Sequence, residues 1–269
     1  MARSCVVVGS GRAGGSFHGA MGKAGWATQL VAARSLVSGA LPDGPSTETS
    51  DTATIQTLEF GLDTVDLVLL AVPDRAIVEV ARTLPATDAV VAHVSGACGL
   101  DVLAPHRRIG SIHPLMSLPD AATGSRRLLD SCTFAVDGDP LMAEVAASLG
   151  GRAITVAASS RALYHATASI AANHLVVICA QVESLAWQVG VPVDAYWTMM
   201  RNTLENVADV GSAAALTGPA ARADWDTIRA HLVALPTGED RRLYRVLCEH
   251  AAGLAGHDMP GWWAAAAPK

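Results

Sequence analysis

The sequence predicts an α/β protein with a doubly wound parallel sheet, followed by an all-α part. Three observations support this prediction. Short β-branched apolar runs alternate with helix-like segments up to about residue 156, the run at 5–8 leads directly into a Gly-x-Gly-x-x-Gly loop, and no convincing strand pattern follows residue 159. With 269 residues, 51% of them apolar, the chain suits one large or two modest domains.

The first element is a strand over 5–8, and a helix-like segment over 16–24 follows the glycine loop. In such a loop Gly9 allows a tight turn, Gly11 lets the backbone approach a pyrophosphate, and Gly14 lets the helix pack closely on the strand. The free N–H groups at the helix start favour phosphate. An ordinary strand-turn-helix is the alternative. The residues predicted to bind a dinucleotide are Gly9, Ser10, Gly11, Arg12, Ala13 and Gly14.

The second apolar run, 29–33, ends at Arg34 and Ser35, twenty residues past Gly14. An NAD-selective site places Asp or Glu near this point to bind the ribose 2′-hydroxyl. A guanidinium instead pairs well with a 2′-phosphate, and a serine hydroxyl can add a hydrogen bond. The sequence therefore predicts NADP(H) as cofactor, with a solvated arginine at a strand end as the alternative.

The remaining elements complete the sheet and then an all-α part. Strands are predicted at 54–58 (weak), 65–72, 89–94, 109–112, 133–136 and 153–156, with helices over 75–84 and 140–149. Helices over 159–189, 194–210, 220–235 and 239–254 follow, punctuated by Pro192, Pro219 and Pro236. We expect a nucleotide-binding Rossmann domain at 1–157, a helical domain at 158–255, and a tail at 256–269. Trp262 and Trp263 in that tail leave open whether it frays or docks on a partner subunit.

Composition excludes several classes of function. A net charge of −6 and a pI near 5.8 argue against a general nucleic-acid surface. No signal peptide is expected, and the apolar stretch 166–182 looks too short and too polar to span a bilayer, since it carries Asn173, His174 and Gln181. The five scattered cysteines predict reduced, mostly buried thiols in a cytoplasmic protein. No Cys/His cluster has zinc spacing, so no metal is expected.

Ligands of open α/β sheets gather at the carboxyl ends of the strands. Ala71, Val72 and Pro73 end one strand, where they are expected to flank the nicotinamide ribose, although a structural strand terminus is equally compatible. Ser95 and Gly96 follow the next strand, and His113 and Pro114 follow the one after it. Reduction by hydride needs a proton donor, and histidine titrates near working pH. We therefore expect His113 to donate a proton and Ser95 to orient the substrate, with structural roles as the alternative.

A polar stripe lies on the predicted helix 159–189. His165, Ser169 and Asn173 follow i, i+4, i+8 spacing, Tyr164 lies beside them, and alanines surround them. Buried polar groups need partners, so the stripe suggests a substrate-binding wall, and hydrogen bonds between helices are the alternative. Arg126 and Arg127, expected in a loop after His113, could clamp a substrate carboxylate or simply be solvated.

Seven segments together resemble the Rossmann-like proteins with a DUF2520 C-terminal domain, within the 6-phosphogluconate-dehydrogenase-like superfamily. The segments are 8–14, 69–74, 93–97, 110–115, 162–166, 203–207 and 215–219. The resemblance spans about residues 3–254. Related families include ketopantoate reductases, pyrroline-5-carboxylate reductases, prephenate dehydrogenases and β-hydroxyacid dehydrogenases.

The resemblance implies an NADP-dependent oxidoreductase that reduces a small ketone or imine of the 2-oxo or 2-imino acid class. The Ser95 and His113 pattern is similar to that of prephenate and 3-hydroxyacyl-CoA dehydrogenases, where that histidine handles the hydroxyl proton. Asn173 is similar to the helix asparagine of β-hydroxyacid and ketopantoate enzymes, but Ser169 replaces their lysine, which favours His113 as the acid. Catalytic residues are thus His113, Ser95 and Asn173, and substrate-binding residues are Gly96, Pro114, Tyr164, His165 and Ser169.

Two other functions remain open: a non-catalytic NADP(H)-binding sensor or scaffold, which the missing lysine favours, and a deazaflavin-linked NADP oxidoreductase, which rests on fold resemblance alone. Long C-terminal helices in the superfamily often pack between protomers, so the resemblance also implies a homodimer. The expected partner is a small-molecule substrate, with neither nucleic acid nor membrane involved. The sequence names no particular substrate and no physiological direction.

Overall fold

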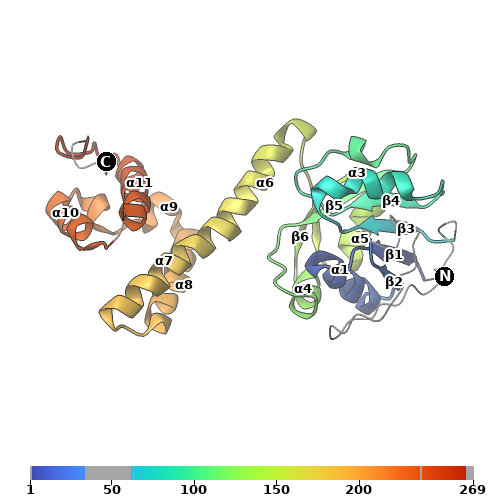
Figure 1. Cartoon of the computed structure of the whole chain (residues 1–269), viewed down its shortest axis with the longest axis horizontal. Coiled ribbons are helices and arrows are strands. Elements are labelled where there is room, and N and C mark those ends of the chain that lie inside the picture. The colour runs from blue at the N-terminus through green and yellow to red at the C-terminus, as the bar shows by residue number, and fades with distance from the viewer. Residues whose placement is uncertain (1, 34–61, 63, 237, 265–269) are drawn as a thin grey trace, which may run out of the picture. The chain divides into compact units, whose positions relative to one another are not determined.

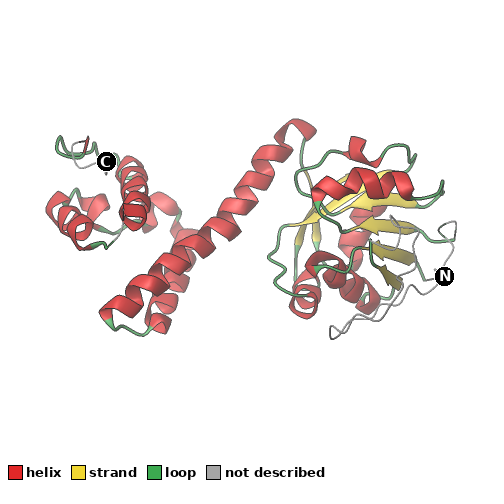
Figure 2. Ribbon diagram, viewed as in Figure 1, coloured by secondary structure: helices red, strands yellow, loops and turns green. Residues whose placement is uncertain are grey.

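The computed structural model describes residues 2–33, 62, 64–236 and 238–264 (Figure 1). These residues form two compact units, 1–173 and 174–269. The described residues of the first unit form a sheet of seven strands, and the regular elements described in the second unit are helices (Figure 2). The α/β prediction, with helices after the sheet, is therefore confirmed. The strand predicted at 54–58 lies outside the described residues, as do Arg34 and Ser35.

The sheet has the strand order β2-β1-β3-β4-β5-β6-β7. Neighbouring strands run parallel, with the exception of β5 and β6, which pair antiparallel from Gly110 opposite Gly138 to Pro114 opposite Phe134. The expectation of an all-parallel sheet is thus corrected at the β5–β6 pair. The strands are β1 (Ser4–Val8), β2 (Ala27–Val31), β3 (Leu67–Leu70), β4 (Val90–His93), β5 (Ile109–Pro114), β6 (Thr133–Gly138) and β7 (Arg152–Thr155).

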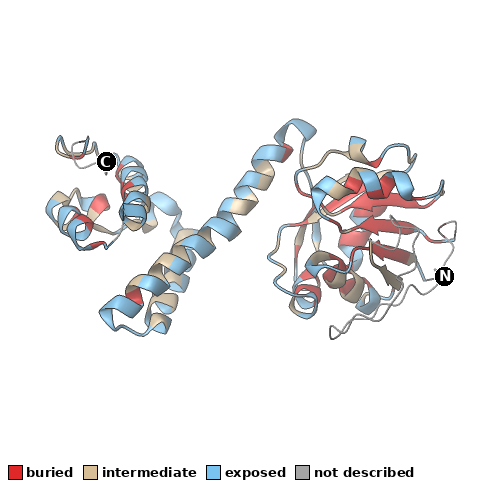
Figure 3. Cartoon of the chain, in the orientation of Figure 1, coloured by how far each residue is buried: buried red, intermediate tan, exposed pale blue. Residues whose placement is uncertain are grey.

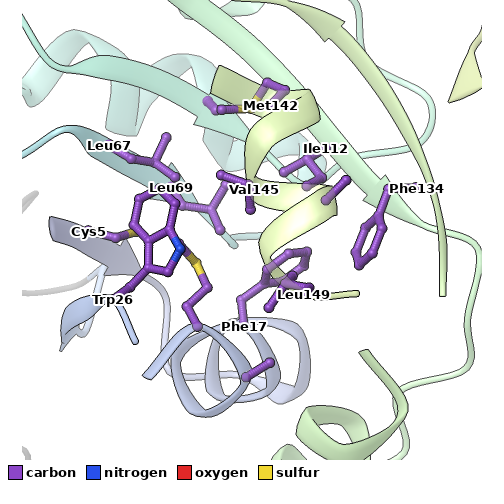
Figure 4. Packing of buried hydrophobic residues seen from close by; sticks show 14 of the residues in the cluster. Cys5, Phe17, Trp26, Leu67, Leu69, Ile112, Phe134, Met142, Val145 and Leu149 are labelled. Atoms are coloured by element: carbon purple, nitrogen blue, oxygen red, sulfur yellow. The ribbon is translucent and has the colours of Figure 1, made fainter. Parts of the chain in front are cut away.

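Helices cover both faces of the sheet because successive residues of its central strands are buried on opposite sides. On one face, Cys5 and Val7 of β1 join a core with helices α1 (Arg12–Lys23), α4 (Ala121–Leu128) and α5 (Leu141–Ser148). Figure 4 shows Phe17, Val145 and Leu149 of this core beside the strand residues. On the other face, Val6 and Val8 pack with α3 (Asp74–Thr83) and the short helix η1 (Leu100–Leu103). Buried residues are correspondingly concentrated in the strands (Figure 3).

Two helices of the first unit differ from the prediction. Helix α1 begins at Arg12, directly after the N-cap Gly11, and not at Ser16. Residues 121–128 form α4, where the sequence predicted a loop carrying Arg126 and Arg127. The Asp120 carboxylate caps α4 by accepting a hydrogen bond from the Thr123 N–H at 2.7 Å, which compensates for the weak helix propensity of the glycine and serine that follow.

The helix predicted at 159–189 contains an interruption. Helix α6 (Arg161–Ser169) passes through a π-helical turn, Ile170–His174, into α7 (Leu175–Val189). The whole helical run 158–189 is long and apolar enough by composition to cross a membrane, and none of its most apolar window is buried. The expectation that this region is too short for a span is therefore wrong as regards length, because the helix continues beyond both ends of the apolar stretch.

The second unit continues with α8 (Val193–Val210), α9 (Ser212–Ala215), α10 (Trp225–Ala234) and α11 (Gly238–Leu254). The predicted helix 220–235 is split, because Ala223 has a positive φ of 51° and Asp224 then caps α10. The tail docks on its own chain: Trp263 is buried in a small core with Ile228 and Leu232, and its indole N–H bonds Glu249. The Arg245 guanidinium lies 4.2 Å from the centre of its ring.

Candidate active site at the carboxyl edge of the sheet

The glycine loop after β1 has the geometry that the sequence predicted. Gly9 adopts φ +113°, and its N–H donates to the Val31 carbonyl at 2.7 Å. A Cβ on Gly9 would overlap the Ala71 carbonyl oxygen, and one on Gly14 would overlap the Gly9 carbonyl oxygen. A Cβ on Gly11 would meet no atom of the described residues within 4 Å. The first and third glycines are therefore required by the fold itself, whereas Gly11 borders open space.

That open space lies at the start of helix α1. Gly11 is an extended N-cap without a side-chain hydrogen bond, and the first turn holds no acidic residue. Because the first N–H groups of a helix have no intrahelical acceptor, they present partial positive charge to a ligand. Ser10 and Arg12 are exposed beside them. The donors present fit the pyrophosphate of a dinucleotide.

The end of β3 borders the same loop. The Ala71 N–H donates to the Val8 carbonyl at 2.8 Å, and the Ala71 methyl lies against Gly14. Val72 is buried, whereas Pro73 is exposed and serves as the N-cap of α3. The structure therefore brings Ala71 and Val72 beside the glycine loop, and Pro73 follows them in the chain.

His113 and Tyr164 form the best-defined polar contact at this edge. His113 lies near the end of β5 and Tyr164 lies in the second turn of α6. The Tyr164 hydroxyl lies 2.8 Å from His113 Nδ1, and the two rings meet edge to face with centroids 5.5 Å apart. Among the described residues, no hydrogen bond is made by the other ring nitrogen of His113, Nε2. Nε2 is thus the nitrogen that remains for a substrate.

Gly96 lets two imidazoles approach the loop after β4. A Cβ on Gly96 would lie 2.8 Å from His113 Nε2 and 2.8 Å from His165 Nδ1. The His113 and His165 rings are 5.8 Å apart. His165 Nδ1 is buried and has no hydrogen-bond partner within the described part of the chain. Gly96, His113, Tyr164 and His165 are therefore assembled at one place, although 69 positions separate the first from the last in sequence.

Ser95 follows β4, and its hydroxyl is already engaged in a turn. His93 pairs with Ser111 across β4 and β5, and continuing that register by two residues aligns Ser95 with His113. The Ser95 hydroxyl oxygen accepts hydrogen bonds from the N–H groups of Ala97 at 3.1 Å and Cys98 at 3.0 Å. The two residues are thus carried by neighbouring strands, and these bonds show that the Ser95 oxygen holds the loop after β4.

Burial makes His113 a weak base. Desolvation lowers the pKa of His113 to about 4, with further lowering by His165, Arg161 and His93 and an opposing effect of Asp74. Burial likewise lowers the pKa of His93 and raises the pKa of the Tyr164 hydroxyl. His113 is therefore neutral at neutral pH in this arrangement. The expectation that it titrates near working pH is corrected, because that expectation assumed a solvated imidazole.

The polar stripe on the helix divides. Tyr164 and His165 face His113, and Pro114 is buried at the end of β5. Asn173 is exposed within the π-helical turn, and Ser169 is half-buried at the end of α6. No hydrogen bond from either side chain to the His113 group occurs in the described ranges, nor does any group of three or more His, Cys, Asp or Glu that could hold a metal. The helix thus contributes its first turns to this group.

Arg161, the first residue of α6, was not predicted as part of the site. It is only 6% exposed. Its guanidinium donates to the Ser111 hydroxyl at 2.7 Å, the Cys98 carbonyl at 3.0 Å and the Asp137 carboxylate at 3.1 Å. The signal available in sequence was a lone arginine three residues before Tyr164, which does not differ from a solvated helix start.

Comparison with known families agrees with this architecture. The model of a Rossmann-like domain matches residues 2–119, and the model of DUF2520, a domain of unknown function, matches residues 132–251. The chain is a Rossmann-like protein with a DUF2520 domain. No curated protein sequence matches it. The DUF2520 match includes β6, β7, Arg161 and Tyr164, whereas Gly96 and His113 lie in the Rossmann-like match.

Solved structures share the fold over nearly the whole chain. A Bacteroides fragilis protein described as an NADP oxidoreductase has a TM-score of 0.73 at 17% identity, covering 94% of this chain and 98% of its own. A Streptococcus pyogenes 1-pyrroline-5-carboxylate reductase has a TM-score of 0.58 at 13% identity, covering 94% and 99%. An Aspergillus terreus reductive aminase in complex with NADPH has a TM-score of 0.53 at 11% identity, covering 96% and 89%. At these identities the likeness establishes the fold.

Proposed function

We propose that this DUF2520 protein is an NADPH-dependent oxidoreductase that reduces a small ketone or imine, of the 2-oxo or 2-imino acid class. The observation that carries the proposal is the His113–Tyr164 pair at the carboxyl edge of a sheet whose first strand ends in a fitted dinucleotide loop. Proteins of this fold that are described as an NADP oxidoreductase, a pyrroline-5-carboxylate reductase and a reductive aminase support it.

The loop from Gly9 to Gly14 would hold the pyrophosphate, with Arg34 and Ser35 at the 2′-phosphate and Ala71, Val72 and Pro73 beside the nicotinamide ribose. NADPH supplies a hydride when bound. The open face of Gly11 supports this assignment because the backbone there can approach a phosphate without interference from a side chain. Residues 1–157 would thus bind the cofactor, and 158–255 would supply the substrate wall and the dimer contact.

His113 would donate the proton from Nε2. For Nε2 to carry hydrogen in a neutral imidazole, Nδ1 must be the acceptor, so the Tyr164 hydroxyl donates to Nδ1 and fixes this tautomer. As the Nε2–H bond breaks and the substrate O–H or N–H bond forms, the Tyr164 proton moves to Nδ1. Water then protonates Nε2 while the proton on Nδ1 returns to the tyrosine oxygen, which restores the starting tautomer. This relay avoids an imidazolate, and it needs no imidazolium, in keeping with the low pKa of His113.

The other predicted residues would surround the reacting group. His165 Nδ1, buried and without a partner among the described residues, would accept a hydrogen bond from the substrate beside Gly96. Ser95 and Asn173 would orient the substrate, with Pro114 and Ser169 lining it. Because the Ser95 oxygen already accepts two backbone N–H groups, only its O–H remains to be donated.

We also propose a cytoplasmic homodimer. Large apolar side chains are exposed along the helices from α6 to α8, and burial against a second copy would remove them from water. Within the second unit the Gln181 amide of α7 donates hydrogen bonds to Asp240 of α11. A polar side chain bonded to an acidic residue at this position is unsuited to a helix that faces lipid. The exposed side chains are Leu163, Ile170, Val176, Val177, Trp187, Val189, Met199, Leu204 and Val210.

The test combines ligand binding with turnover. Thermal-shift measurements with NADPH and NADH should show stabilisation by NADPH, about 2.7 kcal/mol at one hundred times the dissociation constant. A panel of small oxo and imino acids should then reveal NADPH oxidation. R34D should weaken NADPH far more than NADH, and equal losses would contradict the phosphate-binding role. NADPH binding without turnover of any panel member favours a sensor or scaffold, and NADPH-dependent reduction of a deazaflavin favours the third function.

A further inference from the structure

Arg161 joins three parts of the first unit to the start of α6. Its terminal nitrogens donate to Ser111 of β5, to Asp137 of β6 and to the backbone of Cys98 in the loop after β4. The side chain is 7% exposed, whereas its Asp137 partner is 34% exposed. A buried guanidinium with three protein acceptors of this kind is held in one orientation, because each donor has a fixed direction in the planar group.

Helix α6 and strand β5 are joined by two hydrogen bonds at matching positions. Ser111 and His113 are two residues apart on β5 and therefore point to the same side of the sheet. Arg161 and Tyr164 are three residues apart on α6 and therefore share one helix face. The bonds Arg161 to Ser111 and Tyr164 to His113 join these two rows. Sliding or rotating α6 by one residue would break both bonds.

We infer that Arg161 is a positioning residue, which fixes α6 on β5 so that the Tyr164 hydroxyl meets His113 Nδ1. It touches neither reacting ring through a hydrogen bond, and it acts on them through the helix that it anchors. Its consequence for catalysis rests on the proposed function, since the tautomer of His113 matters there. The positioning itself is a property of the chain without cofactor or substrate.

The test is the state of the His113 ring in the full-length ¹⁵N-labelled protein, measured by NMR without NADPH. In the wild type, Nδ1 should be the unprotonated nitrogen at neutral pH, and Y164F shows the spectrum when the hydrogen bond is lost. R161M, R161K and S111A should each shift the His113 signals toward those of Y164F. Lysine keeps the positive charge, but its single ammonium group cannot reproduce the spread N–H groups with which the guanidinium reaches three acceptors. R108M is the matched control, because Arg108, which directly precedes β5, pairs with Asp139, which directly follows β6, and is half exposed.

A pH titration of the same signals separates position from charge. The pKa of His113, about 4 in the wild type, should rise toward the ordinary 6.5 in both R161K and R161M. A rise in R161M alone means that Arg161 acts by its charge, which overturns the inference. Wild-type His113 signals in folded R161K and S111A overturn it as well, even where R161M does not fold. Failure of the proposed reductase would appear separately, as normal His113 signals without NADPH binding or turnover.

Discussion

The Tyr164 hydroxyl lies 2.8 Å from His113 Nδ1, and a second pair, His231 and Tyr244, repeats this geometry at 2.7 Å in the other unit. Both ring pairs meet edge to face, with centroids 5.5 and 5.8 Å apart. His113 is mostly buried at the sheet edge, whereas His231 is exposed on α10. The His231–Tyr244 pair can therefore serve as a control for the His113–Tyr164 pair, because it has the same hydrogen bond outside the candidate site.

Y164F should lower NADPH-dependent turnover of an identified substrate by about 10²–10⁴-fold, the span of general acid catalysis, because His113 loses the group that fixes its tautomer and restores its proton. The folded state should lose only the ~0.5–1.5 kcal/mol of one hydrogen bond. Steady-state kinetics and thermal unfolding measure these two effects. Y244F should cost similar stability and leave turnover unchanged. Equal turnover in Y164F and wild type would remove Tyr164 from the mechanism.

The second prediction separates the glycines of the nucleotide loop. G11A should unfold at the wild-type temperature without ligand, since its Cβ meets no atom of the described residues within 4 Å. It should bind NADPH at least ~10-fold more weakly, because the methyl group enters the proposed phosphate position. G14A should be destabilised even without ligand, because its Cβ would overlap the Gly9 carbonyl oxygen. Nicotinamide fluorescence reports binding, and thermal unfolding reports stability. NADPH affinity retained in G11A would argue against the loop as the pyrophosphate site.

Gly96 provides a third prediction. An added Cβ would lie 2.8 Å from the nearest nitrogens of both His113 and His165, too close for either ring to stay in place. G96A should therefore lower the free energy of unfolding by about 1–3 kcal/mol, as overpacking does, and also reduce turnover. G253A is the control: Gly253 lies in α11, where an added Cβ would meet no atom within 4 Å, and alanine there should stabilise the helix by about 0.5–1 kcal/mol. Unchanged stability in G96A would show that the two rings can move aside freely.

Stability should fall as the pH drops from about 6.5 to about 4. The pKa of His113 in the folded protein is lowered to about 4 from 6.5, so the unfolded chain takes up a proton first as acid is added. The contribution is complete above pH 6.5 and is lost by pH 4, with a magnitude of up to about 3 kcal/mol at 1.36 kcal/mol per pKa unit. Urea unfolding across this range, wild type against H113N, isolates the effect from the carboxylates. Parallel profiles for the two proteins would contradict the burial of a neutral His113.

Local sequence signals predicted the parts of the site that depend on strand ends. The glycine loop follows a β-branched run, Ser95 follows β4 and His113 lies near the end of β5, so the pairing of these parallel strands brings both residues to one edge. Burial could not be predicted in this way. Arg161 looks like any charged helix start until acceptors from β5 and β6 surround it, and the low pKa of His113 depends on the same long-range packing.

Other elements escaped prediction for related reasons. Helix α4 contains Gly124 and Ser125, and it is stabilised by the Asp120 cap and by close packing against α1, where Gly15 faces Ala121. The antiparallel pairing of β5 with β6 depends on the path of the chain between them, which apolar patterning does not encode. The π-helical turn at Ile170–His174 could not be predicted, because its residues are equally compatible with a regular α-helix.

The exposed apolar helix surface leads to the last prediction. Val176 and Val177 of α7 are 66% and 56% exposed, and Trp187 is 84% exposed, so a second copy that buries them would gain about 25 cal/mol for each Å² of apolar area covered. Light scattering of the full chain should therefore give the mass of a dimer, 55 kDa from two chains of 27.7 kDa. V177E should shift it toward the monomer, because a carboxylate would be buried without a partner. V233E on α10 is the control, since Val233 is 76% exposed outside α6–α8. A monomeric wild type that co-sediments with phospholipid vesicles would instead assign this surface to a membrane.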